Sequence, residues 1–221
     1  SNYTPPRGTY HASRSVMESF ARLAAKLDAH TAAAGPPTAD VLGRMSALDR
    51  DAAGLTAHLV AKYRAAVKRC EGLGINRWPP QVIHADWHAG NMLFLSTRVA
   101  AVIDYDTARF GPRVIDTANG ALQFSMSSDG PDPTGWSDGI EEERFRAFLT
   151  GYDEADNPVL ASAELRSVPH LMIEALIAES VLPVARTGFF GRLHGQAFLS
   201  MIRRKVEWIE SHADRLVSLV E

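Results

Sequence analysis

Apolar residues recur every three or four positions over most of the chain, which predicts a mainly helical protein. Ser15 and Glu18 form a capping-box pattern, in which a serine and a glutamate satisfy the first N–H groups of a helix, so we expect a helix to begin there. A second helical stretch is expected from Thr38 or Asp40 to Gly74, as one bent helix or as two. Further helices are expected over 140–152, 164–184 and 196–220.

Between the helical stretches, the apolar residues gather in short runs instead. Runs of four or five residues that are rich in branched side chains and bounded by polar loops are typical of buried strands. Such runs are expected to form strands at 81–84, 92–95 and 99–103. A turn-rich segment from Asp129 to Asp138 predicts a loop. The sequence therefore predicts the α+β class, as a mainly α domain with a small β element that holds polar loops.

Composition narrows the class of protein without defining its function. With 46% apolar residues the 221-residue chain can bury a sizeable core. Its net charge of −3 gives no reason to expect nucleic acid or an anionic membrane as a partner. Cys70 is the single cysteine, which excludes an internal disulfide framework and favours a reducing compartment. We recognise neither a signal peptide nor an apolar run near the roughly 18–20 residues of a membrane span, and expect a cytoplasmic protein.

The residues best suited to chemistry lie between His84 and Asp106. A loop carries Asp86, Asn91 follows five residues later, and the third predicted strand ends at Asp104. Transfer of a phosphoryl group requires positioning, divalent metal and a residue that receives the proton of the nucleophile. Mg²⁺ prefers oxygen ligands and retains waters, so one aspartate and one asparagine, together with nucleotide phosphates, suffice to hold it. These residues in this order favour phosphoryl transfer.

The same residues resemble the motifs of one enzyme family. The segment 84–91, His-Ala-Asp-Trp-His-Ala-Gly-Asn, is similar to the catalytic loop of aminoglycoside phosphotransferases and choline kinases, often written HGDxHxGN. The segment 103–106, Ile-Asp-Tyr-Asp, resembles the metal-binding segment of that family, and 111–116 resembles the GDPxxDLA stretch that follows it. The resemblance extends over roughly 15–220 and implies a protein-kinase-like C-terminal lobe.

The resemblance also implies roles for individual residues. Asp86 would be the catalytic base, or would orient the substrate hydroxyl. Asn91 and Asp104 would bind Mg²⁺ that bridges the phosphates of ATP or another nucleoside triphosphate, and Asp106 is a further candidate metal ligand. The substrate would be a small molecule with a hydroxyl group, since related enzymes act on aminoglycosides, macrolides, choline, homoserine and sugars.

Three further residues of the motifs are implied to support the catalytic loop. His84 and Asp116 would brace it through hydrogen bonds, and His88 occupies a position where the family often has histidine. A lone aspartate or asparagine in a loop usually serves in a turn or a cap. The ordered combination of these residues, each in the expected context, therefore carries the functional hypothesis.

The parts with which a kinase of this type holds its nucleotide are not identified in the sequence. They are a phosphate-covering loop and a strand lysine paired with a helix glutamate, in an N-terminal lobe of on the order of a hundred residues. Lys26 lies on a predicted helix instead. We therefore expect 1–14 to be a tag or hinge remnant and 15–221 to be a C-terminal lobe whose N-terminal lobe is absent or truncated. This chain alone is then expected to transfer phosphate poorly or not at all.

Two other interpretations of the sequence are open at this point. His84, Asp86 and His88 alternate along the loop, and imidazole with carboxylate would suit zinc, so a metallohydrolase is one alternative. It supplies only three ligands and leaves Asn91 and Asp104 without a role. The other alternative is an inactive kinase-like lobe that serves as a binding or interaction module. An exposed apolar face where the N-terminal lobe would sit would then favour self-association.

Overall fold

The computed structural model describes residues 39–96, 98–127, 130, 132–155 and 160–221, with side chains from Gly54 onwards except that of Arg186. The predicted helix that begins at Ser15 lies outside these residues. The described helices are α2 (Ala39–Leu73), α3 (Val114–Ser125), α4 (Glu142–Glu154), α5 (Ser162–Thr187), α6 (Gly195–Ser211) and α7 (Ala213–Ser218). The described strands are β1 (Pro80–Ile83), β2 (Met92–Leu95), β3 (Arg98–Val102), β4 (Arg109–Pro112), β5 (Phe189–Phe190) and β6 (Leu193–His194). The predicted class, mainly α with small sheets, is confirmed.

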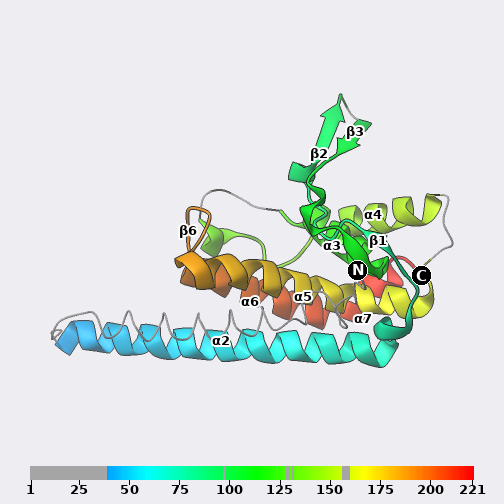
Figure 1. Cartoon of the computed structure of the whole chain (residues 1–221). Helices are drawn as coiled ribbons and strands as arrows, with labels where there is room; N and C mark the ends of the chain where they lie inside the picture. Colours follow the sequence, from blue (N-terminus) through cyan, green and yellow to red (C-terminus); the bar gives the residue numbers. More distant parts are fainter. Residues whose placement is uncertain (1–38, 97, 128–129, 131, 156–159) are drawn as a thin grey trace, which may run out of the picture.

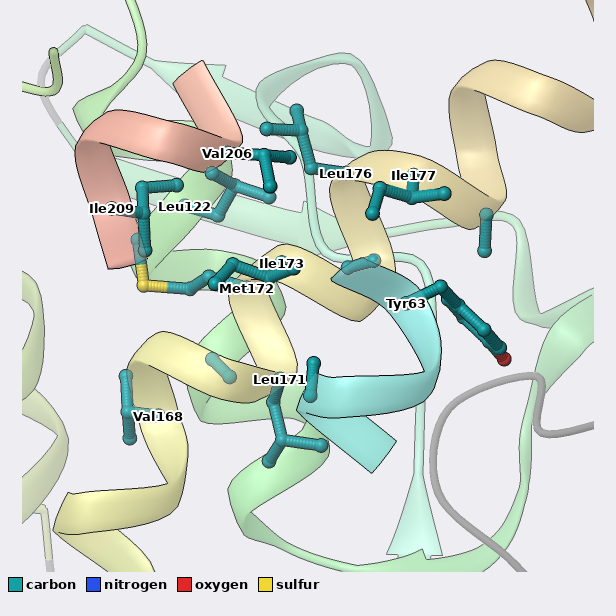
Figure 2. Packing of buried hydrophobic residues seen from close by; sticks show 14 of the residues in the cluster. Tyr63, Leu122, Val168, Leu171, Met172, Ile173, Leu176, Ile177, Val206 and Ile209 are labelled. Atoms are coloured by element: carbon teal, nitrogen blue, oxygen red, sulfur yellow. The ribbon is translucent and has the colours of Figure 1, made fainter. Parts of the chain in front are cut away.

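Helix α5 lies at the centre of the helical body. Every residue from Leu171 to Ala178 is buried, and a helix with apolar residues all round has to be surrounded by other elements. It packs against α2, α3, α6 and α7, and Figure 1 shows α2 running along the side of this body. Figure 2 shows the contributions of four helices to the core: Leu171, Ile173, Leu176 and Ile177 of α5, Tyr63 of α2, Leu122 of α3, and Val206 and Ile209 of α6.

Strands are present at all three predicted positions, but the prediction that they are buried is wrong for most of their residues. Strand β1 pairs antiparallel with β4, and β2 pairs antiparallel with β3 from Met92 opposite Val102 to Leu95 opposite Arg98. The β2–β3 hairpin is mostly exposed and projects away from the helices (Figure 1). An apolar run identifies a strand, but burial also requires a second layer packed on the sheet.

Two helices differ from the prediction. Helix α2 is continuous, which decides between one helix and two over that stretch. The single helix expected over 196–220 is wrong, because His212 has φ −110° and ψ 10° and separates α6 from α7. The His212 ring stacks on Trp208 at a centroid distance of 4.1 Å. Strand β4 and helix α3 are not predicted from the sequence. The buried residues of α3 include the large Val114, Ile115 and Leu122 as well as the small Ala118, Gly120 and Ala121.

Charged and amide groups join α3 to α5. Nε and Nη2 of Arg113, just before α3, donate to Oε1 and Oε2 of Glu164 over 3.0 and 2.8 Å. Further along the two helices, the amides of Asn119 and Gln123 donate to the two carboxylate oxygens of Glu179 over 2.7 and 2.9 Å. The start of α3 is therefore fixed against the central helix.

Helix α6 holds the loop that follows α3. Arg204 donates from Nη2 to the carbonyl oxygens of Pro133, Thr134 and Trp136, and from Nε to the Asp138 carboxylate over 2.6 Å. The buried Lys205 next to it donates to the carbonyls of Ser137 and Gly139. This pair, which we call the α6 latch, holds the described part of the predicted loop from 133 to 139.

One described helix is long and apolar enough to cross a membrane by length and composition. It is Ser162–Ala185 within α5, and 78% of its most apolar window is buried inside the protein. The sequence analysis does not recognise this stretch as a membrane span. Its packing against α2, α3 and α6 accounts for its apolar character, since the core helix of a folded domain meets the same criteria.

The close approach of α3 and α4 predicts an effect of substitution at Gly120. A Cβ atom there would lie 2.1 Å from Cζ of Phe148, so Gly120→Ala would separate the two helices. We expect it to lower the free energy of unfolding by about 1–3 kcal/mol. Gly151→Ala on α4 has nothing within 4 Å and is expected to be neutral or stabilising. Equal urea denaturation midpoints for the two variants would contradict this packing.

The ion pair between Arg113 and Glu164 predicts a pH-dependent stability. Burial raises the pKa of Glu164, but hydrogen bonds from Arg113 and the Ala161 N–H outweigh it, so the pKa lies below its ordinary 4.5. The stabilisation is therefore present above that pH and is lost as the pH falls through the lowered pKa. We expect Glu164→Gln to cost about 2 kcal/mol at neutral pH, and less below pH 4.5.

Chemical denaturation of both proteins across the acid range measures this difference. Glu142→Gln, in the exposed pair with Arg215, is the matched control and is expected to have a much smaller effect. A cost at Glu164 that stays constant from neutral pH to strongly acidic pH would show that the charge of the carboxylate is not its source.

Candidate active site

The loop that carries Asp86 is fixed at its start by Asp116. After β1, the backbone N–H groups of His84 and Ala85 donate to Oδ2 and Oδ1 of Asp116, each over 2.7 Å. Asp116 lies in the first turn of α3, so the loop is tied to the helical body. Burial raises the pKa of Asp116, while the two N–H donors and the Trp87 side chain oppose that rise by stabilising the carboxylate.

Ala85 adopts a backbone conformation that favours glycine. Its φ is 63°, and its side chain is 2% exposed. A side chain at such a φ costs about 1–2 kcal/mol, because Cβ crowds the following carbonyl. The HGDxHxGN pattern has glycine at this position, and this chain has alanine. The hydrogen bond from the Ala85 N–H to Asp116 helps to hold the strained residue in place.

His84 connects the loop to the segment that follows β3. Its Nε2 is 2.9 Å from the carbonyl oxygen of Ile103, and because a carbonyl only accepts, this nitrogen carries a proton. The carbonyl of His84 accepts from the Thr107 hydroxyl over 2.9 Å. The imidazole also lies 4.8 Å from the ring of Tyr105. The candidate catalytic loop and the candidate metal segment are thus joined through one histidine.

Asn91 lies at the junction of the two segments. Its buried Nδ2 donates to the carbonyl oxygen and to Oδ2 of Asp86 over 3.0 and 2.9 Å. Its backbone carbonyl accepts from the Ile103 N–H over 2.9 Å, one residue before Asp104. With Nδ2 committed to Asp86, the amide presents Oδ1 as its remaining polar atom.

His88 is packed beside Asp86 by the tight turn that follows it. Its Nδ1 accepts from the Gly90 N–H over 3.0 Å, so in the neutral ring the proton is on Nε2. That nitrogen lies 3.6 Å from Oδ2 of Asp86. A Cβ at Gly90 would lie 2.8 Å from Cε1 of His88, so the absence of a side chain lets the ring approach the turn.

The carboxylates after β3 are exposed. Asp104 has φ 64° and ψ 65°, a left-handed conformation in which aspartate is found more often than most residues. Asp106 follows in the short 3-10 turn Tyr105–Thr107. Together with the amide oxygen of Asn91 they are hard oxygen donors, of the kind that Mg²⁺ takes when it keeps several waters. The donor chemistry of these residues therefore suits a magnesium ion.

The structure does not favour the zinc alternative. Among the described residues, no group of three or more histidine, cysteine, aspartate or glutamate side chains is arranged to hold a metal. His84 directs Nε2 to a backbone carbonyl, and Asp86 is hydrogen-bonded to Asn91. His88 lies near Asp86, but the three predicted zinc ligands do not converge.

Comparison with known proteins identifies the family. Residues 3–161 match the model of the phosphotransferase enzyme family, which covers well over half of the chain. The chain therefore belongs to this family, and the resemblance to aminoglycoside phosphotransferases and choline kinases is confirmed. No curated protein and no solved structure matches the chain.

The predicted site residues differ in how closely the structure brings them together. One hydrogen-bonded or closely packed group contains His84, Asp86, His88, Asn91 and Asp116. Asp104 directly follows Ile103, which is hydrogen-bonded to His84 and Asn91 of this group. Asp106 lies exposed in the turn that follows, outside that group. The sequence analysis does not identify Thr107, whose hydroxyl supports the His84 carbonyl. Its position three residues after Asp104 is the only sequence signal. The catalytic and metal-binding roles stay predictions.

The conformation of Ala85 predicts opposite effects for two substitutions. Ala85→Gly relieves the left-handed strain and is expected to leave the free energy of unfolding unchanged or to raise it by up to about 1 kcal/mol. Ala85→Val adds branched bulk at a buried, left-handed position and is expected to cost at least about 2 kcal/mol. Thermal and urea unfolding of both variants measure the difference. A valine variant as stable as the glycine variant would contradict the positive φ.

Proposed function

We propose that this chain supplies the catalytic and magnesium-binding loops of an ATP-dependent phosphotransferase that phosphorylates a hydroxyl group of a small molecule. The observation that carries the proposal is the junction at Asn91, whose side chain bonds to Asp86 and whose backbone bonds to Ile103, next to Asp104. Asn91 thus links a candidate base, Asp86, through its side chain to the segment of a candidate metal ligand, Asp104, through its backbone. Family membership supports phosphoryl transfer as the reaction.

In this proposal, the oxygen of the substrate hydroxyl attacks the terminal phosphorus of the nucleotide while Asp86 receives the hydroxyl proton. The bond from that phosphorus to the bridging oxygen breaks, and the nucleoside diphosphate leaves. Asn91 Nδ2 and the neighbouring His88 hold the carboxylate in one orientation. Oδ1 of Asn91 and the carboxylate of Asp104 would hold Mg²⁺, with Asp106 as a further ligand. When bound, the ion neutralises charge on the phosphates.

We further propose that 15–221 form the C-terminal lobe of a protein-kinase-like fold and that the protein works in the cytoplasm. The mainly helical body with small antiparallel sheets is compatible with such a lobe. The second candidate function is that of a catalytically incomplete lobe that acts as an interaction module. The exposed β2–β3 hairpin favours it, since apolar surface of this kind marks contact sites.

Metal binding tests the proposal without requiring turnover. With Mn²⁺ as the probe, followed by electron paramagnetic resonance, we expect Asp104→Ala and Asn91→Ala each to weaken binding by about tenfold or more. Asp214→Ala removes an exposed carboxylate from the first turn of α7 and is the matched control, with no change expected. Unchanged affinity in Asp104→Ala would exclude this residue as the ligand.

Phosphate transfer from MgATP to a panel of hydroxyl compounds tests the reaction itself. The chain alone is expected to turn over poorly or not at all, for want of an identified lysine-bearing strand and phosphate loop. Robust turnover that Asp86→Asn abolishes would overturn that expectation while supporting the role of Asp86. Turnover that survives Asp86→Asn would exclude Asp86 as the base.

A further inference from the structure

The segment that carries Asp104 and Asp106 is hydrogen-bonded on both sides to one residue, His84. Before the segment, Nε2 of the His84 ring donates to the carbonyl oxygen of Ile103 over 2.9 Å. After it, the Thr107 hydroxyl donates to the backbone carbonyl of His84 over 2.9 Å. The residues between these two bonds are exposed to solvent. Both candidate metal ligands therefore lie between two hydrogen bonds to the same residue.

The backbone of Asp104 needs support from outside its own side chain. Its φ of 64° and ψ of 65° are left-handed, a conformation that residues with a Cβ disfavour. Its side chain forms no capping hydrogen bond to the turn Tyr105–Thr107 that follows, so it does not stabilise this conformation itself. Residues in such conformations persist where the surrounding structure holds them. The hydrogen bonds of Ile103 before it and of Thr107 after it are contacts of this kind.

The Thr107 hydroxyl differs from one that only supports its own turn. Serine and threonine hydroxyls in turns commonly bond to groups a few residues away. Thr134 is an example, because it lies exposed in the short 3-10 turn Pro133–Gly135 and bonds through its N–H and its hydroxyl to the carboxylate of Asp132. Thr107 is also exposed in a short 3-10 turn, but its hydroxyl bonds to a carbonyl 23 positions earlier in the sequence. It therefore connects two segments.

His84 is a well-fixed acceptor for the bond from Thr107. Its N–H donates to Asp116 of α3 over 2.7 Å, and the residue is 6% exposed. Nδ1 of its ring is buried and has no hydrogen-bond partner within the described part of the chain, so the ring is committed there to Ile103. Helix α3 thus holds His84, and His84 holds both ends of the segment.

We propose that Thr107 is a positioning residue for the candidate metal site. Its hydroxyl holds the turn after Asp104, so that Asp104 keeps its left-handed conformation and its carboxylate stays in place for a divalent cation. Thr107 does not touch the metal and acts through the backbone of 104–106. The inference rests on the proposed function, in which Asp104 is a ligand of Mg²⁺.

The Mn²⁺ affinity of the full chain, measured by electron paramagnetic resonance, tests this role. Thr107→Val keeps the branched shape and loses the donor, and is expected to weaken binding by about tenfold, as when a group that orients a metal ligand is removed. Thr107→Ala loses the same donor and is expected to behave alike. Thr107→Ser keeps the hydroxyl and is expected to bind like the parent. Thr134→Val, which removes a hydroxyl from the other exposed 3-10 turn, is the matched control with no change expected.

Amide hydrogen exchange in the absence of metal measures the conformation itself. The Ala108 N–H donates to the Tyr105 carbonyl over 2.9 Å and closes the turn. Its exchange is expected to be faster in Thr107→Val than in the parent and in Thr107→Ser. Equal exchange in all three proteins would overturn the proposal, because the hydroxyl would then not hold the turn.

Comparison with Asp104→Ala separates this proposal from the proposed function. If Asp104→Ala weakens Mn²⁺ binding and Thr107→Val does not, the metal site stands and the role of Thr107 is overturned. If Asp104→Ala leaves the affinity unchanged, Asp104 is not the ligand, and the metal site fails together with the role of Thr107. Binding as weak in Thr107→Ser as in Thr107→Val would also overturn the role of the hydroxyl.

Discussion

The two hydrogen bonds from the loop backbone to Asp116 connect the candidate active site to the hydrophobic core. Asp116 lies in the first turn of α3, which the Arg113–Glu164 pair fixes against α5 at one end and Glu179 holds further along. Helix α5 is in turn enclosed by apolar side chains. The core thus holds α5, α5 holds α3, and α3 holds the loop with Asp86. This support positions the loop although the small sheets beside it are exposed.

Helices that bury apolar residues against several neighbours are predictable from sequence, because burial selects those residues at helical spacing. Helix α5 is an example, and its predicted extent of 164–184 agrees with Ser162–Thr187 to within a few residues. Helix α3 also buries Val114, Ile115 and Leu122 at helical spacing, so the sequence does contain its helical pattern, and what spacing does not show is the close approach of Phe148 to Gly120. The prediction that the strands are buried was the larger error, because an apolar run does not specify whether another layer packs on the sheet.

The order of Asp86, Asn91 and Asp104 predicted their place in the candidate site, whereas His84, His88 and Asp116 were expected from the family resemblance. The six residues from Asp86 to Asn91 form a turn in which the amide folds back onto the carboxylate. The left-handed conformation of Ala85 could not be inferred in the same way, because it comes from tertiary hydrogen bonds and alanine gives no local signal. The contact of Thr107 with His84 joins residues that are 23 positions apart in the sequence, and local spacing does not predict contacts over such a separation.

The α6 latch has a consequence for how this protein can diverge. Arg204 and Lys205 mostly bind backbone carbonyl groups, which every amino acid possesses. Among the described side chains of that loop, Asp132, Trp136 and Asp138 also hold its shape through hydrogen bonds, so the exposed positions that depend on the latch alone are Gly135 and Ser137. Mutations can accumulate in them while the backbone path is inherited unchanged. Because α6 holds the backbone of this loop, exposed side chains there can change under selection without a change in the backbone conformation.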